Sequence, residues 1–143
     1  MTEGRARFDD LAPEVRTRTM KAIRSRDSQL ERTIASALWR RGIRFRRNVR
    51  TLFGTPDLAN RRRRLVVFLD SCFWHGCPEH YHVPRTNAEY WAAKVRRNRA
   101  RDIEVTQWYQ TRGWRIVRIW EHEVRLDPAA VVERLASIFG ERA

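Results

Sequence analysis

The sequence predicts an α/β domain in which a mixed central sheet carries helices on both faces. Three observations lead to this prediction. Helical and strand-type segments follow one another in the order α-β-β-β-α-β-α. The run 65–69 (LVVFL) is uninterrupted and apolar, as in strands that are buried on both faces. The chain has 143 residues with 42% hydrophobic residues, so we expect a single domain, 1–143, around one core.

The elements of the first half are predicted from local signals. Residues 1–12 are expected to form a basic, flexible arm, and residues 13–23 have weak helical periodicity. The capping box that begins at Ser28 opens a helix over about 28–41, which ends at Gly42. We expect a strand over 43–45 and a short strand at 58–59.

The second half has clearer boundaries. After the buried strand 65–69, residues 71–86 form an irregular loop dense in Cys, His and aromatic residues. A second capping box, Thr86 to Glu89, opens a long helix that stops at Gly113. A strand over 114–120 follows. Asp127 then precedes a proline, the combination that starts a final helix.

The charge of the chain indicates its partner. Lys and Arg total 30 against 17 Asp and Glu, a formal net charge of +13 with a sequence pI near 11.4. A small domain this basic is expected to bind nucleic acid. No segment is long and apolar enough for a membrane span, and the polar N-terminus does not resemble a signal peptide. We therefore expect a cytoplasmic, nucleoid-associated protein with no membrane partner.

Four metal-ligand residues indicate a structural zinc site. Two thiolates and two imidazoles suit a closed tetrahedral Zn²⁺ site, and such a site would stabilise a loop too irregular to hold its own shape. His75 and His82 are competing ligands, and the alternative is a pair of core cysteines with scattered surface histidines. The proposed ligands are Cys72, Cys77, His80 and His122.

A second group of residues has the chemistry of a hydrolytic site. Asp57 enters a short strand, Asp70 ends the buried strand, and His75 lies five residues beyond it. Carboxylates at the ends of adjacent strands can converge on Mg²⁺, which prefers oxygen ligands. A nearby imidazole could accept the proton of an attacking water. The alternative is that these carboxylates are helix caps or surface charges.

The long helix has a third pattern. At 100° per residue, Trp91, Val95, Asn98 and Asp102 share one stripe, with Lys94 and several arginines around it. The stripe is expected either to face DNA, with Asp102 orienting His75, or to lie on the surface around a partly buried Trp. Phe73 and Trp74 in the loop are candidates for base stacking or wedging.

Taken together, these motifs resemble the very short patch repair endonuclease family over about residues 18–124. The matching segments are Gly-Thr-Pro-Asp57, Cys72-Phe-Trp-His75, Gly-Cys-Pro-Glu-His80, Trp91…Lys94…Asn98…Arg-Asp102 and Gly113-Trp…Trp120-Glu. The resemblance implies a restriction-endonuclease-like fold of the PD-(D/E)XK type. It also implies an enzyme that nicks the T-containing strand on the 5′ side of a T:G mispair, in repair of deaminated 5-methylcytosine.

The resemblance also implies roles for individual residues. Asp57 would bind Mg²⁺ together with the backbone carbonyl of Leu69. His75 would be the general base, Asp102 its partner, and Glu31 a further acid at the edge of the site. Three aromatic residues would wedge into the duplex beside the mispair: Phe73, Trp74 and Trp91. Two polar residues of the long helix, Lys94 and Asn98, would contact DNA.

Two positions depart from the family pattern. The last zinc position, often Cys in relatives, is His122 here, and imidazole binds zinc well. Asp70 stands where some relatives carry His, which leaves two roles open for it, as a metal ligand or as a helper of His75.

Two other functions fit parts of the sequence. One is a non-catalytic zinc module that binds DNA through its Arg surface, and the other is a related nuclease that acts on another DNA or RNA structure. We expect a monomer that binds double-stranded DNA containing a T:G mismatch. Mismatch-repair proteins are candidate partners.

Overall fold

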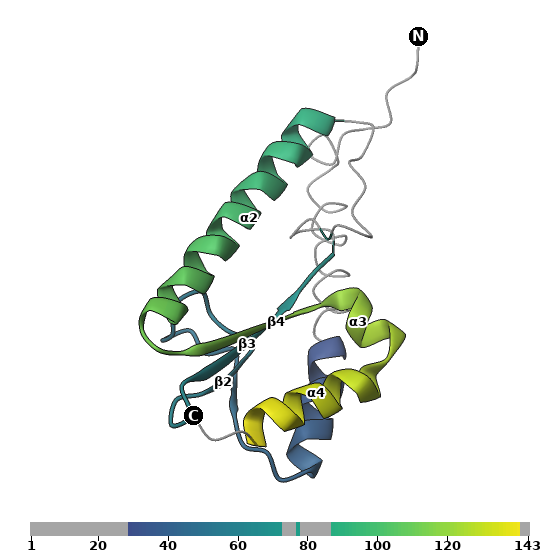
Figure 1. The fold of residues 1–143 in the computed structure, drawn as a ribbon. Helices are drawn as coiled ribbons and strands as arrows, with labels where there is room; N and C mark the ends of the chain where they lie inside the picture. Colours follow the sequence, from purple (N-terminus) through teal and green to yellow (C-terminus); the bar gives the residue numbers. More distant parts are fainter. Residues whose placement is uncertain (1–28, 73–76, 78–86, 141–143) are drawn as a thin grey trace.

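The structure is a computed structural model that describes residues 29–72, 77 and 87–140 (Figure 1). A helix over 29–40 comes first. The labelled elements then follow in chain order: β1 (Arg46–Arg47), β2 (Leu58–Asn60), β3 (Leu65–Asp70), α2 (Ala88–Thr111), β4 (Arg115–Trp120), α3 (Glu121–Leu126) and α4 (Pro128–Gly140).

The four strands form one mixed sheet in the order β1-β2-β3-β4. The β1–β2 and β2–β3 pairs are antiparallel, with Leu58 opposite Val67 in the second pair. The β3–β4 pair is parallel, with Leu69 opposite Ile119. The helix α2 connects these two strands. Because β3 and β4 are parallel, their carboxyl ends lie at the same edge of the sheet. The predicted mixed α/β architecture is confirmed.

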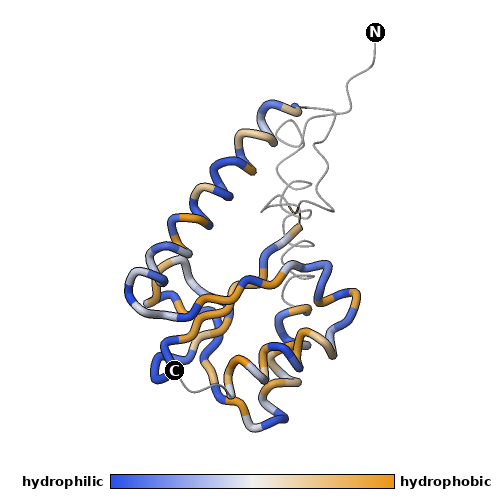
Figure 2. The backbone as a smooth tube through the Cα atoms, viewed as in Figure 1, coloured by the Kyte–Doolittle hydropathy of each residue, from blue (hydrophilic) through white to orange (hydrophobic). Residues whose placement is uncertain are grey.

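Alternation along β3 divides the core between the two faces of the sheet. Leu65 and Val67 pack with the 29–40 helix, α3 and α4, whereas Val66 and Phe68 pack with α2. Figure 1 shows the same arrangement, with α2 on one side of the sheet and the other helices on the opposite side. In Figure 2 the strands are the most continuously hydrophobic part of the chain. Burial on both faces explains why the sequence of β3 shows no polar alternation.

The first helix ends as the sequence predicts. Gly42 has a φ of 82°, and its N–H donates to the Trp39 carbonyl at 2.9 Å. The N–H of Ile43 donates to the Leu38 carbonyl at 3.1 Å. These two bonds form a Schellman motif, in which the left-handed residue just after the helix is most often glycine. The Ser28 cap lies outside the described residues.

The structure differs from the prediction at two boundaries and in one additional helix. The first strand is 46–47 rather than 43–45, because Ile43 and Phe45 pack on the core before the chain meets its partner Ala59. The N-cap of α2 is Asn87, with a φ of 58°, rather than Thr86. The short helix α3 was not predicted, since six residues are too few to show a helical period.

Helix α4 is fixed at both ends. The Asp127 carboxylate accepts a hydrogen bond from the Ala130 N–H at 3.0 Å, which confirms the predicted N-cap. At the other end, Arg115 donates to the Ile138 carbonyl at 3.1 Å and Arg63 donates to the Phe139 carbonyl. Two arginines of the sheet region therefore bind carbonyl groups that the helix itself leaves without an amide partner.

Candidate functional site

The Gly54–Asp57 turn is held against α2 by close contacts. Gly54 has a φ of 74°, and a Cβ atom at this position would lie 2.8 Å from Cγ1 of Val105 in α2. One residue earlier, the Phe53 carbonyl accepts a hydrogen bond from the buried Tyr109 hydroxyl at 2.5 Å. Glycine is therefore required at position 54 both for its backbone conformation and for space. These contacts fix the segment that leads into Asp57.

Asp57 lies beside the end of β3. Its Oδ2 accepts a hydrogen bond from the Leu69 N–H at 2.7 Å. If the β2–β3 register continued, Pro56 would lie opposite Leu69, but proline has no N–H to donate. The Pro56 carbonyl accepts instead from the Val49 N–H at 3.1 Å. The carboxylate of Asp57 thus accepts the hydrogen bond from the Leu69 N–H that the Pro56 carbonyl would accept if the β2–β3 pairing continued.

This replacement has a consequence for the Leu69 carbonyl. In a strand, the N–H and C=O of one residue point to the same side, so the Leu69 carbonyl faces the side on which Asp57 lies. Pro56 has no N–H that could donate a hydrogen bond to the Leu69 carbonyl. A carboxylate and a backbone carbonyl therefore lie together at the end of β3, and both are oxygen ligands of the kind that Mg²⁺ prefers.

Glu31 is connected to the same region through β1. Its side chain is buried, with 7% exposure, and its Oε1 accepts hydrogen bonds from Arg47 Nε at 3.1 Å and from Asn48 Nδ2 at 3.0 Å. Asn48 also donates its backbone N–H to the Asp57 carbonyl at 3.0 Å. Asn48, with a φ of 48°, therefore joins the two acidic residues directly.

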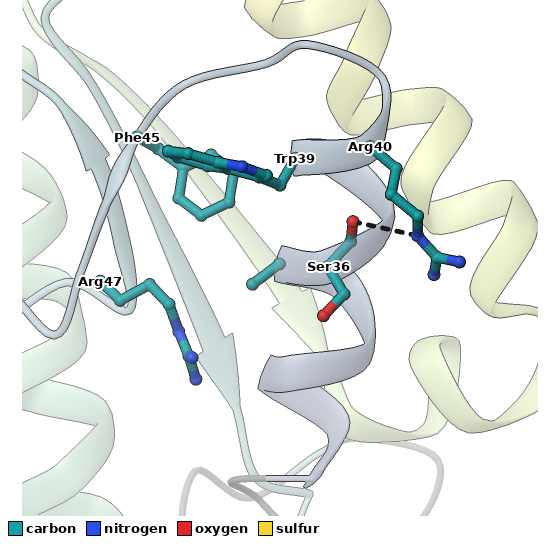
Figure 3. A pocket seen from close by; sticks show the side chains of 6 residues that line it. Ser36, Trp39, Arg40, Phe45 and Arg47 are labelled. Carbon is teal, nitrogen blue, oxygen red and sulfur yellow. Dashed lines mark hydrogen bonds between the residues drawn. The ribbon is translucent and has the colours of Figure 1, made fainter.

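A surface cavity of about 540 Å³ lies beside this acidic region (Figure 3). Arg47 lines the cavity and also binds Glu31, and in Figure 3 it points away from Trp39 and Phe45. Trp39 is half exposed, and the Arg44 guanidinium stacks 3.9 Å from its ring centroid. Among the residues that the structure describes, no predicted site residue lines this cavity, which adjoins the candidate site through Arg47.

The third group of acidic residues is organised by Arg118 of β4. Its Nη1 lies 3.0 Å and 3.1 Å from the two carboxylate oxygens of Asp70, which is 4% exposed. Its Nη2 donates to the Asp102 backbone carbonyl at 3.1 Å, and Nη1 lies 3.7 Å from the Asp102 carboxylate. Nε donates to Thr106 Oγ1 at 3.0 Å, and the guanidinium lies 4.7 Å from the Phe68 ring centroid. One guanidinium therefore connects β3, β4 and α2.

Sequence reasoning missed Arg118, as well as Arg47 and Asn48. A signal for Arg118 was present, because it interrupts the apolar segment Ile116-Val117-Arg118-Ile119. Arginine is rarely buried unless it is paired, so an Arg in such a strand indicates an acidic partner. Nothing in the local pattern indicates which acid that partner is.

The structure brings three of the four predicted zinc ligands together. Nδ1 of His122 lies 3.3 Å from the Cys72 sulfur and 3.4 Å from the Cys77 sulfur, and the three ligand atoms all lie within 4.8 Å of one another. Tetrahedral zinc with these ligand types needs separations of roughly 3.5–4 Å. The cluster forms because Cys72 follows β3 and His122 follows the parallel strand β4.

The chemistry of this cluster fits a soft divalent metal. The pKa of the Cys72 thiol is raised to about 11, mainly by burial and also by the neighbouring Cys77, although a hydrogen bond with the His122 backbone acts to lower it. A bound cation stabilises thiolates and would reverse this effect. Both cysteines are buried thiols, and the set of two sulfurs and one imidazole could hold a metal ion.

The predicted stripe on α2 faces inward. Trp91 and Val95 are buried, and Asn98 and Asp102 are half-buried beside them. Lys94 lies 5.9 Å from the Trp91 ring centroid. Four exposed positions around the stripe are basic: Arg96, Arg97, Arg99 and Arg101.

Trp91 is only 6% exposed, so insertion into DNA would require the side chain to leave its present position. Its role therefore stays a prediction, as do the DNA contacts of Lys94 and Asn98. Four further predicted site residues, and the competing ligand His82, lie outside the described residues: Phe73, Trp74, His75 and His80.

A family model described as "DNA mismatch endonuclease Vsr" matches residues 8–80, about half of the chain. The chain belongs to the Vsr family. The Vsr-family chain is 37% identical over 138 residues to the DNA mismatch endonuclease Vsr of Escherichia coli K12, covering 90% of this chain and 86% of that protein. Membership identifies the chain as a DNA endonuclease, so the alternative of a non-catalytic zinc module is set aside.

Other Vsr-family relatives are named as nicking enzymes. The type II nicking enzyme V.NaeI of Lentzea aerocolonigenes is 42% identical over 126 residues, covering 84% of this chain and 76% of that protein. The type II nicking enzyme V.XorIIP of Xanthomonas oryzae pv. oryzae is 37% identical over 131 residues, covering 91% and 96%. Within the described parts of the Vsr-family chain, no helix has the length and apolar character to cross a membrane. The predicted cytoplasmic, nucleoid-associated location stays a prediction.

Proposed function

We propose that this chain is a Mg²⁺-dependent endonuclease that nicks the T-containing strand on the 5′ side of a T:G mispair. The observation that carries the proposal is the pair of oxygen ligands at the end of β3, where the Asp57 carboxylate lies beside the Leu69 peptide group. Family membership supports the endonuclease activity, and the names of the nicking relatives support cleavage of one strand. The fold would accordingly be restriction-endonuclease-like, of the PD-(D/E)XK type.

In this proposal Asp57 and the Leu69 carbonyl would hold Mg²⁺. The bound ion would polarise the scissile phosphate and lower the pKa of a coordinated water. Glu31 is oriented by hydrogen bonds from Arg47 and Asn48, and it would stand at the edge of the same site. His75 would accept the proton of the attacking water and Asp102 would orient it, as the family resemblance implies.

We also propose that Zn²⁺ occupies the Cys72–Cys77–His122 cluster, with His80 as the fourth ligand. Such a site would connect the segments that follow β3 and β4 at the edge where Asp57 lies. Its role would be structural, because a site closed by four protein ligands leaves no position for substrate.

Selectivity for the mispair would come from stacking. A wobble pair stacks less well than a Watson–Crick pair, so opening the duplex beside it costs less. Phe73, Trp74 and Trp91 would provide the wedge, while Lys94, Asn98 and the exposed arginines of α2 would contact the DNA. The net charge of +13 supports affinity for any duplex and does not itself discriminate.

The test uses zinc-loaded protein, Mg²⁺ and two labelled duplexes that differ only in a T:G or a C:G pair. We expect nicking of the T strand in the first duplex alone. Asp57→Asn should reduce the rate by more than a hundredfold while binding changes little, and Glu104→Gln, which removes an exposed charge from α2, should leave the rate unchanged. Equal cutting of both duplexes would favour a nuclease for another DNA structure. Wild-type rates in Asp57→Asn would remove Asp57 from the site.

A further inference from the structure

Arg118 occupies an unusual position between two of the acidic residues assigned to the candidate site. It lies in β4, opposite Phe68 of β3, with its guanidinium over the Phe68 ring. From there it contacts both carboxylate oxygens of Asp70, and both the backbone carbonyl and the carboxylate of Asp102. A half-buried guanidinium with this many directed contacts has little freedom to move.

Asp70 immediately follows Leu69, and from spacing alone it could be a second ligand for the cation. In the structure both of its oxygens lie at hydrogen-bond distance from Arg118 Nη1, and alternation along β3 directs its side chain to the α2 face, with Val66 and Phe68. The Leu69 carbonyl, in contrast, lies in the plane of the sheet on the β2 side. Asp70 therefore binds Arg118 through both carboxylate oxygens, and its side chain is oriented away from the oxygen pair at Asp57.

We propose that Arg118 is a positioning residue of the nuclease site, which neutralises Asp70, keeps it out of the cation's coordination shell and fixes Asp102 on α2. This inference rests on the proposed cation site at Asp57 and Leu69. Asp70 is then neither a metal ligand nor an independent helper of the base. It is the counter-charge that allows the half-buried Arg118 to hold α2 against the sheet.

The proposal predicts opposite effects from the two partners. Removing the charge of Arg118 leaves Asp70 as an extra negative charge near the cation, whereas removing the charge of Asp70 leaves an extra positive charge. At a site open to water, with an effective dielectric constant of about 80, a unit charge about 7 Å from a divalent cation changes its affinity on the order of tenfold. A purely structural role would weaken cation binding in both variants.

The experiment measures Mn²⁺ binding to zinc-loaded protein at pH 8, from the loss of the free-ion electron paramagnetic resonance signal. Mn²⁺ is the probe because it shares the oxygen preference of Mg²⁺. Arg118→Met, whose apolar chain can still cover Phe68, should bind Mn²⁺ on the order of tenfold more tightly than wild type. Asp70→Asn should bind it more weakly by a similar factor, and the double variant should return to within about threefold of wild type.

Two controls keep the result interpretable. Arg118→Lys keeps the charge but loses the planar fork, so its Mn²⁺ affinity should stay near wild type while the nicking rate falls, because Asp102 is no longer fixed. If Arg118→Met does not fold, the comparison of Arg118→Lys with Asp70→Asn still tests the charge argument. If the Mn²⁺ affinity of Arg118→Lys shifts as strongly as that of Asp70→Asn, the charge argument is overturned.

The outcomes also separate this inference from the proposed function. If Asp57→Asn binds Mn²⁺ as tightly as wild type, the proposed cation site at Asp57 is refuted. If Asp57→Asn loses Mn²⁺ but Arg118→Met and Asp70→Asn shift in the same direction, or neither shifts, the cation site stands and the positioning role of Arg118 is refuted.

Discussion

Replacing Gly54 with alanine tests how the fold places Asp57. Alanine would have to adopt a φ of 74°, which costs an L-residue roughly 1–2 kcal/mol. Its Cβ would also lie 2.8 Å and 3.1 Å from the two methyl carbons of Val105, which is buried in α2. Overpacking of this kind costs about 1–3 kcal/mol. Together these effects predict a loss of about 2–5 kcal/mol in the free energy of unfolding.

The assay is urea unfolding of zinc-loaded protein, with Gly42→Ala as the matched control. Gly42 also has a positive φ, of 82°, but a Cβ there would meet no atom within 4 Å. Gly42→Ala should therefore lose only the conformational part, about 1–2 kcal/mol. The difference between the two variants isolates the contact with Val105.

Activity gives a second measurement on the same protein. Relief of the contact requires the turn or α2 to shift, and the turn carries Asp57, so the nicking rate should fall even at temperatures where Gly54→Ala stays folded. Adding Val105→Ala should cost less in Gly54→Ala than in wild type, because it removes the methyl groups that the new Cβ meets. If Gly54→Ala loses no more stability than Gly42→Ala, the close contact does not govern this turn.

Three further predictions concern stability. Tyr109→Phe should lower the free energy of unfolding by about 1–2 kcal/mol, because it leaves the Phe53 carbonyl without its donor. Burial raises the Tyr109 pKa to about 12, so stability should decline as pH rises from 10 towards 12, and this part of the decline should be missing from Tyr109→Phe in alkaline urea titrations. Asp127→Ala should cost about 1 kcal/mol in the same assay through loss of the α4 cap. Chelation of zinc, or Cys77→Ser, should lower the melting temperature measured by circular dichroism, and an unchanged value would refute the structural zinc site.

Features set by local chemistry were predictable from the sequence. The buried strand, the helix end at Gly42 and the cap at Asp127 each follow from a few adjacent residues, and each is confirmed. The start of β1 was predicted wrongly because a strand of two residues is defined by its partner, not by its own propensity. Short paired strands have little sequence signal of their own.

The sequence indicated several residues of the candidate site but not the connections between them. The sequence indicated Cys72, Cys77 and His122 as ligands of one ion, and the structure brings these three residues together after the parallel strands β3 and β4. The pairing of Asp70 with Arg118 joins residues 48 positions apart, and that of Glu31 with Arg47 joins residues 16 apart. Such pairs depend on sheet topology, which no local pattern specifies.

The position of Pro56 has a consequence for how this site can vary. A ligand supplied by a backbone carbonyl is unaffected by the side chain attached to it, so position 69 can change among strand-forming residues while the same oxygen faces Asp57. The residue type is instead constrained at Pro56, which lies across the sheet from position 69. Pro56→Ala would supply an N–H that can bind this carbonyl and extend the β2–β3 ladder into the site. Sequence variation is thus expected to be restricted at Pro56 and permitted at position 69, whose carbonyl is the proposed ligand.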